Sequence, residues 1–136
     1  MRSRTIVLGI FIMGLTLLAA GAASAAPPTG LAWMMNANGF EGPFIITSID
    51  AQGNLLGTFF GEPIFGFWDE TAQKITFMRT PIPNNPQTFQ IYTGFLFVSG
   101  PEVTYNLAGY FEAFAGTGAT ATRTLYGWFA RLTLIP

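Results

Sequence analysis

The sequence predicts an all-β protein: an eight-stranded, antiparallel, up-and-down β-barrel preceded by a cleavable signal peptide. Three observations lead to this prediction. After residue 25, eight short apolar runs alternate with turn residues, and no segment shows the 3.6-residue spacing of an amphipathic helix. The connections are also too short to cross over between parallel strands. Closing such a sheet into a barrel removes the exposed strand edges of an open sheet.

The first five predicted strands are short and are separated by residues that favour turns. Asp50-Ala51-Gln52-Gly53-Asn54 is a good hairpin turn, and Gly61-Glu62-Pro63 and Asp69-Glu70-Thr71 end the next two runs. Asp69 is expected to begin its turn rather than to act as a catalytic carboxylate. The predicted strands are Leu31–Asn36, Phe44–Ile49, Leu55–Phe60, Ile64–Trp68 and Lys74–Thr80.

The last three predicted strands are longer: Thr88–Ser99, Val103–Ala115 and Arg123–Ile135. Both faces of these strands carry apolar side chains, so the sequence does not decide which face lines the barrel. In the first of them, one face holds Phe89, Ile91, Phe95 and Phe97, and the other holds Gln90, Tyr92, Gly94 and Leu96. A second apolar face is expected to be covered, by another subunit, a surface or lipid. We therefore expect a homo-oligomer, and membrane association is the less favoured alternative.

Residues 1–25 have the anatomy of a secretory signal peptide. Arg2 and Arg4 precede the apolar stretch Ile6–Ala20, and Ala23-Ser24-Ala25 fits the small-residue preference of signal peptidase. The apolar stretch is short for a retained membrane anchor. We predict cleavage after Ala25, a single domain over residues 26–136, and a secreted or periplasmic location.

The composition excludes several kinds of chemistry. The chain contains no cysteine and no histidine, so it has no disulfide, no thiolate or imidazole ligand for a metal, and no Ser-His-Asp triad. Seven acidic residues stand against six basic ones, without a basic cluster, which argues against a nucleic-acid partner. We expect no enzyme activity, no cofactor and no metal.

Four segments resemble the avidin and streptavidin family. Trp33-Met34-Met35-Asn36-Ala37-Asn38-Gly39 is similar to the family's opening Trp-x-Asn-x-x-Gly, and Leu56-Gly57-Thr58-Phe59 follows in order. Tyr92-Thr93-Gly94 looks like the family's central aromatic-(Thr/Ser)-Gly, and Gly127-Trp128-Phe129-Ala130 falls in the last strand. The resemblance implies an eight-stranded barrel that binds a small ligand inside.

The same resemblance argues against tight binding of biotin. Asn36 corresponds to the family's asparagine ligand of the biotin ureido oxygen, but Phe40 stands where a serine is expected. Phe59 replaces the ureido-binding tyrosine, Phe77 replaces a tryptophan of the pocket wall, and no aspartate follows Trp128. A site that depends on buried polar groups loses affinity steeply when those groups are absent.

The leading hypothesis is an exported, non-catalytic barrel that binds a small apolar ligand or a protein partner. The alternatives are a structural or self-assembling envelope protein and, less favoured, a cyclase- or isomerase-like enzyme for an apolar substrate. Candidate pocket residues are Trp33, Asn36, Phe59, Trp68, Phe77, Tyr92 and Trp128. These aromatic side chains could equally fill the barrel interior. Glu112 is expected to pair with Arg123 or Arg131 or to line a cavity, and Lys74 and Arg79 to reach solvent.

Overall fold

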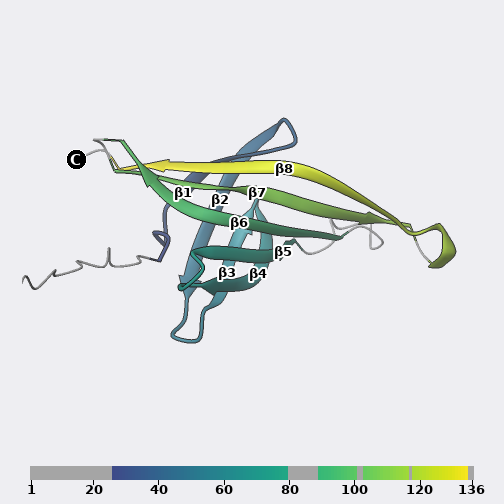
Figure 1. Cartoon of the computed structure of the whole chain (residues 1–136), viewed down its shortest axis with the longest axis horizontal. Helices are drawn as coiled ribbons and strands as arrows, with labels where there is room; N and C mark the ends of the chain where they lie inside the picture. Colours follow the sequence, from purple (N-terminus) through teal and green to yellow (C-terminus); the bar gives the residue numbers. More distant parts are fainter. Residues whose placement is uncertain (1–25, 80–88, 101–102, 117, 135–136) are drawn as a thin grey trace, which may run out of the picture.

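In the computed structural model, the chain forms a closed barrel of eight antiparallel strands in up-and-down order (Figure 1). The structure describes residues 26–79, 89–100, 103–116 and 118–134. The predicted fold class is confirmed, whereas the predicted signal peptide lies outside the described residues. The elements are β1 (Ala32–Ala37), β2 (Phe40–Ile49), β3 (Asn54–Phe59), β4 (Glu62–Asp69), β5 (Lys74–Arg79), β6 (Phe89–Ser99), β7 (Thr104–Ala115), a short 3-10 turn η1 (Gly118–Thr120) and β8 (Thr122–Thr133).

The strand bounds differ most from the prediction at β2, which begins four residues before the expected Phe44. Asn38 and Gly39 both have positive φ and form a tight turn, and the Asn36 side chain accepts a hydrogen bond from the Gly39 N–H at 2.9 Å. Phe40 can therefore pair directly with Ala37. The glycine and proline at 42 and 43 hid this part of the strand from the sequence analysis.

The strands are of unequal length, and this asymmetry shapes the molecule. β1, β3 and β5 have six residues each, whereas β6 has 11 and β7 and β8 have 12. In Figure 1, β6, β7 and β8 run side by side as long green to yellow strands that project beyond the shorter ones. One wall of the barrel is thus a long three-stranded sheet.

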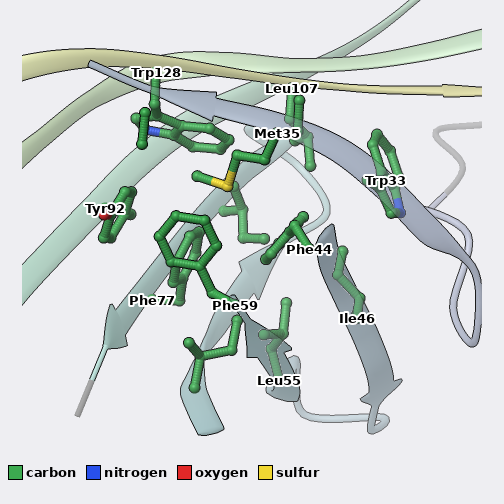
Figure 2. Close-up of a cluster of buried hydrophobic side chains, with 14 of the residues drawn as sticks. Trp33, Met35, Phe44, Ile46, Leu55, Phe59, Phe77, Tyr92, Leu107 and Trp128 are labelled. Carbon is green, nitrogen blue, oxygen red and sulfur yellow. The ribbon is translucent and has the colours of Figure 1, made fainter. Parts of the chain in front are cut away.

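The interior of the barrel is filled by large side chains. Trp33, Met35, Phe44, Phe59, Phe77 and Tyr92 are all buried, and they pack together across the barrel (Figure 2). The register places Phe77, Tyr92, Phe111 and Tyr126 side by side on β5 to β8, with neighbouring ring centroids 4.6, 4.7 and 5.1 Å apart. We call these four residues the aromatic ladder. Stacked rings of this kind contribute to stability beyond the area that they bury.

Trp128 lies beside the ladder, where Gly94 makes room for its indole and Gly109 allows β7 to approach the backbone of β6. A Cβ at Gly94 would collide with the Trp128 ring, and a Cβ at Gly109 would collide with the Thr93 carbonyl. The indole N–H donates to the carbonyl oxygens of Thr93 and Tyr110, at 3.1 and 3.0 Å. These contacts identify the inner face of β6 to β8, which the sequence left undecided.

The polar residues of the hairpins behave largely as expected. The Asp50 carboxylate accepts hydrogen bonds from the backbone N–H groups of Gln52 and Asn54, and the side-chain amide of Asn54 helps to lower the pKa of Asp50. Asp69 accepts a hydrogen bond from the Ala72 N–H at 3.0 Å, which confirms its role in the turn. Glu112 forms an ion pair with Arg123 on the neighbouring strand, which is one of the arrangements that the sequence predicted.

The contact between Trp128 and Gly94 can be tested by adding a single methyl group. We expect Gly94→Ala to lower the free energy of unfolding by about 1–3 kcal/mol, because the indole is held by two carbonyl groups and cannot move away freely. Gly127→Ala is the matched control, since its new methyl group would meet no atom closer than the Gly109 carbonyl oxygen at 4.0 Å. Urea denaturation of both variants measures the difference, and equal stabilities would contradict this account of the packing.

Candidate functional site

A cavity of about 500 Å³ opens at one end of the barrel. We call this the cavity end: it carries the β1–β2, β3–β4 and β7–β8 connections, and β5 ends and β6 begins there. The aromatic core fills the barrel below, so the cavity is a cup above a closed floor rather than a channel. The lining residues are Ala37, Asn38, Phe40, Glu41, Phe60, Arg79, Gln90, Tyr92, Phe111, Ala113 and Tyr126.

The apolar wall of the cavity is the upper part of the aromatic ladder. Tyr92, Phe111 and Tyr126 come from β6, β7 and β8 and line the cavity from neighbouring positions of three paired strands. One position further toward the cavity end, the inner face of β7 carries only Ala113. A small side chain at this level leaves the space that a larger one would fill.

Three polar side chains face the cavity from β5 and β6. The Tyr92 hydroxyl donates a hydrogen bond to the Gln90 Oε1 at 2.9 Å. Burial raises the pKa of the Tyr92 phenol above its usual range, and the positive charge of Arg79 offsets only part of that shift. Tyr92 is therefore a neutral hydrogen-bond donor at physiological pH. Arg79 and Gln90 are direct register partners, so the three polar groups form one cluster.

Arg79 is the most unusual of the lining residues. Its guanidinium carbon lies 5.3 Å from the ring centroid of Phe59 and 5.8 Å from that of Phe60. Its Nε is buried and has no hydrogen-bond partner among the residues that the structure describes. We expected Arg79 to reach solvent, but its position two residues after Phe77 places it on the inner face of β5. Cation–π contacts with two rings hold it there.

The residues predicted for the pocket separate into five groups. Tyr92 lines the cavity, and Phe59, Phe77 and Trp128 lie below it and contact one another and Tyr92 in the core. Figure 2 shows Trp33 at one side of the cluster and Tyr92 and Trp128 at the other. Trp68 lines a different hollow at the opposite end of the barrel, and Asn36 holds the β1–β2 turn by accepting from Gly39 and donating to Glu41.

The sequence analysis did not single out Arg79, Gln90, Phe111 or Tyr126 as pocket residues. A usable signal was nevertheless present. Gln90 lies two residues before Tyr92, and Arg79 lies two residues after Phe77, so strand alternation puts each of them on the same face as a candidate pocket residue. Phe111 and Tyr126 depend on the pairing register, which the sequence does not specify.

A second hollow, of about 730 Å³, lies at the opposite end of the barrel. It is lined by the segment 26–29 and by the β2–β3 and β4–β5 turns, together with Trp68, whose buried indole N–H has no partner in the described part of the chain. Turn backbone and side chains such as Asp50 and Asp69 dominate it, and both of these carboxylates already accept hydrogen bonds within their own turns. The cavity with aromatic walls is the better candidate for a ligand site.

The described residues contain neither a metal site nor a membrane-spanning helix. No group of three or more acidic side chains in these residues could hold a metal ion. Within the same ranges, no helix is long and apolar enough to cross a membrane.

No protein-family model matches this chain, and no curated protein matches it significantly. Solved structures of shwanavidin are similar to it. A low-affinity mutant of shwanavidin gives a TM-score of 0.55 at 15% identity, covering 80% of this chain and 98% of that one. Apo shwanavidin gives 0.54 at 15% identity, covering 82% and 100%. A complex of the mutant with biotin gives 0.53 at 14% identity, covering 79% and 100%.

These similarities confirm the resemblance to the avidin family at the level of the fold. They extend over nearly the whole length of the shwanavidin chains, so the entire barrel is shared rather than a single hairpin. At 14–15% identity they show the fold alone. The function has to be argued from the cavity of this chain.

Proposed function

We propose that this chain is a non-catalytic binding protein that takes a small, mainly apolar ligand in the cavity at the cavity end. The observation that carries the proposal is a cup of about 500 Å³ whose walls are ring faces and whose polar groups are few and clustered. Small-molecule sites are typically concave and apolar, with a few polar groups that orient the ligand. The core below is closed, so a ligand enters and leaves by the same mouth.

We infer that biotin is not the preferred ligand. One of the similar structures is a complex of a shwanavidin mutant with biotin. This chain lacks most of the polar side chains that the family resemblance implies for the ureido group of biotin. Asn36 is engaged in the β1–β2 turn, and Phe59 and Phe77 have no hydroxyl or indole N–H to offer. The ureido group of biotin would therefore lack the partners that the family resemblance implies, and a buried polar group without its partners is costly.

A binding role is also favoured over an enzyme role by the chemistry of the cavity. Its titratable side chains are Arg79, Tyr92, Tyr126 and Glu41, and Tyr92 keeps its proton because burial raises its pKa. Glu41 lies at the rim, where it accepts a hydrogen bond from Asn36. This set provides hydrogen bonds and one positive charge, but no buried general base beside a nucleophile.

Filling the cavity tests the binding proposal. We expect purified protein to bind a planar apolar probe such as naphthalene-2-carboxamide saturably in isothermal calorimetry, and to show no tight binding of biotin. Ala113→Phe should abolish probe binding, because the added ring would occupy the cavity. Ala72→Phe, in the exposed β4–β5 turn, is the matched control and should bind normally. Unchanged affinity in a folded Ala113→Phe variant would refute the site, and sub-micromolar biotin binding would refute the ligand class.

We further propose that the protein is exported and that cleavage follows Ala25. The folded domain supports this position, because Pro27 is fully buried and the Gly30 N–H donates to the Ile46 carbonyl at 2.8 Å. Ordered packing in the described residues therefore begins at Pro27, two residues after the predicted cleavage site. The proposed location is outside the cytoplasm, either periplasmic or secreted.

The mass of the mature protein tests the export proposal. Expressed from its full-length gene, the protein should be recovered from the periplasm or the medium with Ala26 as its first residue. Replacing Ala23 and Ala25 by bulky residues should leave the uncleaved chain associated with the membrane, because signal peptidase requires small residues there. Recovery of the uncleaved chain from the cytoplasm of the wild type would contradict the proposal.

We also propose that the chain forms a homo-oligomer through the outer surface of β4 to β8. Large apolar side chains on this surface are exposed, with 51% of Phe95, 45% of Tyr110 and 52% of Phe129 accessible. We define the apolar outer face by Phe67, Phe95, Tyr110, Leu125 and Phe129. Thr76, Thr93 and Gly127 lie between these residues in the register and keep the face flat. A monomer rarely exposes a patch of this kind.

A second copy of the chain is the occupant that fits this face best. Charges of both signs lie at its borders, with Lys74 opposite Asp69 and Arg123 paired with Glu112, as a two-fold contact between identical surfaces requires. A bilayer fits less well, because β5 has only six residues and a membrane-spanning strand needs about 9–11.

Sedimentation can decide whether the apolar outer face joins two copies. The wild type is expected to sediment as an oligomer in detergent-free buffer, and Tyr110→Glu should dissociate it, because each contact would then bury an unpaired charge. Val103→Glu puts the same charge at an exposed apolar residue just before β7 and should leave the oligomer intact. A monomeric wild type, or flotation with lipid vesicles instead of self-association, would overturn the proposal.

A further inference from the structure

We propose that the cavity selects a carboxylic acid in its anionic form, with the carboxylate paired to Arg79 and a planar apolar body against Tyr92, Phe111 and Tyr126. This inference rests on the proposed function and names the chemical class of its ligand. The juxtaposition that carries it is the buried Nε of Arg79, which has no acceptor among the described residues, at the edge of a cavity with aromatic walls.

The Nε–H group of Arg79 has no acceptor among the described residues. A buried N–H without an acceptor is destabilising, so native proteins rarely leave one without a reason. The Phe59 and Phe60 rings offer π faces to the guanidinium, but no acceptor for the N–H in its plane. The edge formed by Nε and a terminal nitrogen is the edge that binds a carboxylate with two parallel hydrogen bonds.

No carboxylate of the described residues pairs with Arg79. In the described ranges, the only ion pair joins Arg123 and Glu112 on the outer surface. Glu41 is the only acidic residue that lines the cavity, and its carboxylate accepts a hydrogen bond from the Asn36 amide on the β1 side of the barrel. Arg79 thus provides a positive charge that no acidic side chain of the described residues neutralises.

Another polar side chain lies next to Arg79. Gln90 is the register partner of Arg79 on β6, and its oxygen is occupied by the Tyr92 hydroxyl. The amide is thereby oriented so that its N–H₂ group remains as a donor. Arg79 and Gln90 together present donors from two neighbouring strands, which suits an acceptor-only group such as a carboxylate.

The charge and size of the ligand are also constrained. A single guanidinium balances a single negative charge, whereas a doubly charged phosphate would leave one charge uncompensated beside apolar walls. A bare inorganic anion would leave most of the 500 Å³ cavity unfilled. A monocarboxylate with a flat apolar body uses both the donors and the aromatic ladder.

Matched pairs of ligands that differ only in charge test this inference. Naphthalene-2-carboxylate and naphthalene-2-carboxamide, and benzoate and benzamide, are titrated by isothermal calorimetry into the wild type, Arg79→Gln, Arg79→Lys and Arg131→Gln. Arg131 lies on the outer face of β8 and is exposed, so its variant controls for the loss of a positive charge.

We expect each acid to bind the wild type at least about tenfold more tightly than its amide, as a charge-assisted pair requires. Arg79→Gln should remove this preference while retaining the amide affinity, Arg79→Lys should keep part of it, and Arg131→Gln should leave it unchanged.

The outcomes separate this inference from the proposed function. If the amides bind as tightly as the acids, or if Arg79→Gln keeps the preference for acids, the carboxylate assignment is overturned while the binding site stands. If neither member of any pair binds, the proposed function fails together with this inference. A preference for acids that is lost equally in Arg131→Gln would show a general charge effect and would also overturn the assignment.

Discussion

The packing of the Trp128 indole against the backbone of β6 and β7 is the contact on which the rest of this barrel depends. The ring fits only because position 94 has no side chain, and its N–H is shared between two carbonyl oxygens on the strands beneath it. This arrangement settles which face of the three long strands points inward. With that face fixed, Tyr92 and Phe111 must also point inward, where their rings stack. The residues that alternate with them along β6 and β7 must point outward. The aromatic ladder and the apolar outer face are two consequences of one choice of register.

The filled core in turn determines where a ligand can bind. Rings from β2, β3, β5 and β6 meet at the middle of the barrel, where Phe44 and Phe77 stack with centroids 5.2 Å apart, and this leaves no central chamber. Space remains where the ladder ends and the next inward residue of β7 is Ala113. On β5, the next inward residue after Phe77 is Arg79, which lies at the mouth of the cavity. A ligand in this cavity would rest on aromatic rings rather than being enclosed by them, and Arg79 would lie beside it in the lining.

The sequence predicted the strands and turns because those signals are local. Asp50 and Gly53 specify their hairpin whatever surrounds them, and all eight strands lie where apolar runs stand between such turns. The site was harder to predict because both faces of β6 to β8 are apolar, so alternation did not reveal whether Phe95 or Leu96 points inward. Trp33 and Trp68 were predicted to line the pocket because tryptophan is common in ligand sites, but both lie toward the opposite end of the barrel. Arg79 was missed because an arginine at a strand end usually reaches solvent, although alternation from Phe77 places it on the inner face, where the Phe59 and Phe60 rings hold it.

The two unusual features of this barrel, exposed rings outside and an unpartnered cation inside, have a common physical basis. The chain has few charged residues, so it relies on aromatic side chains to fill its core and leaves many of them on its outer face. In such a surrounding a guanidinium is tolerated only where ring faces replace part of its hydration, as Phe59 and Phe60 do. Ring faces stabilise the charge but accept none of its in-plane hydrogen bonds, so the donor at Nε stays unmet. The arrangement that lets this barrel keep a cation at its mouth is thus also the arrangement that leaves the cation able to recognise an anion.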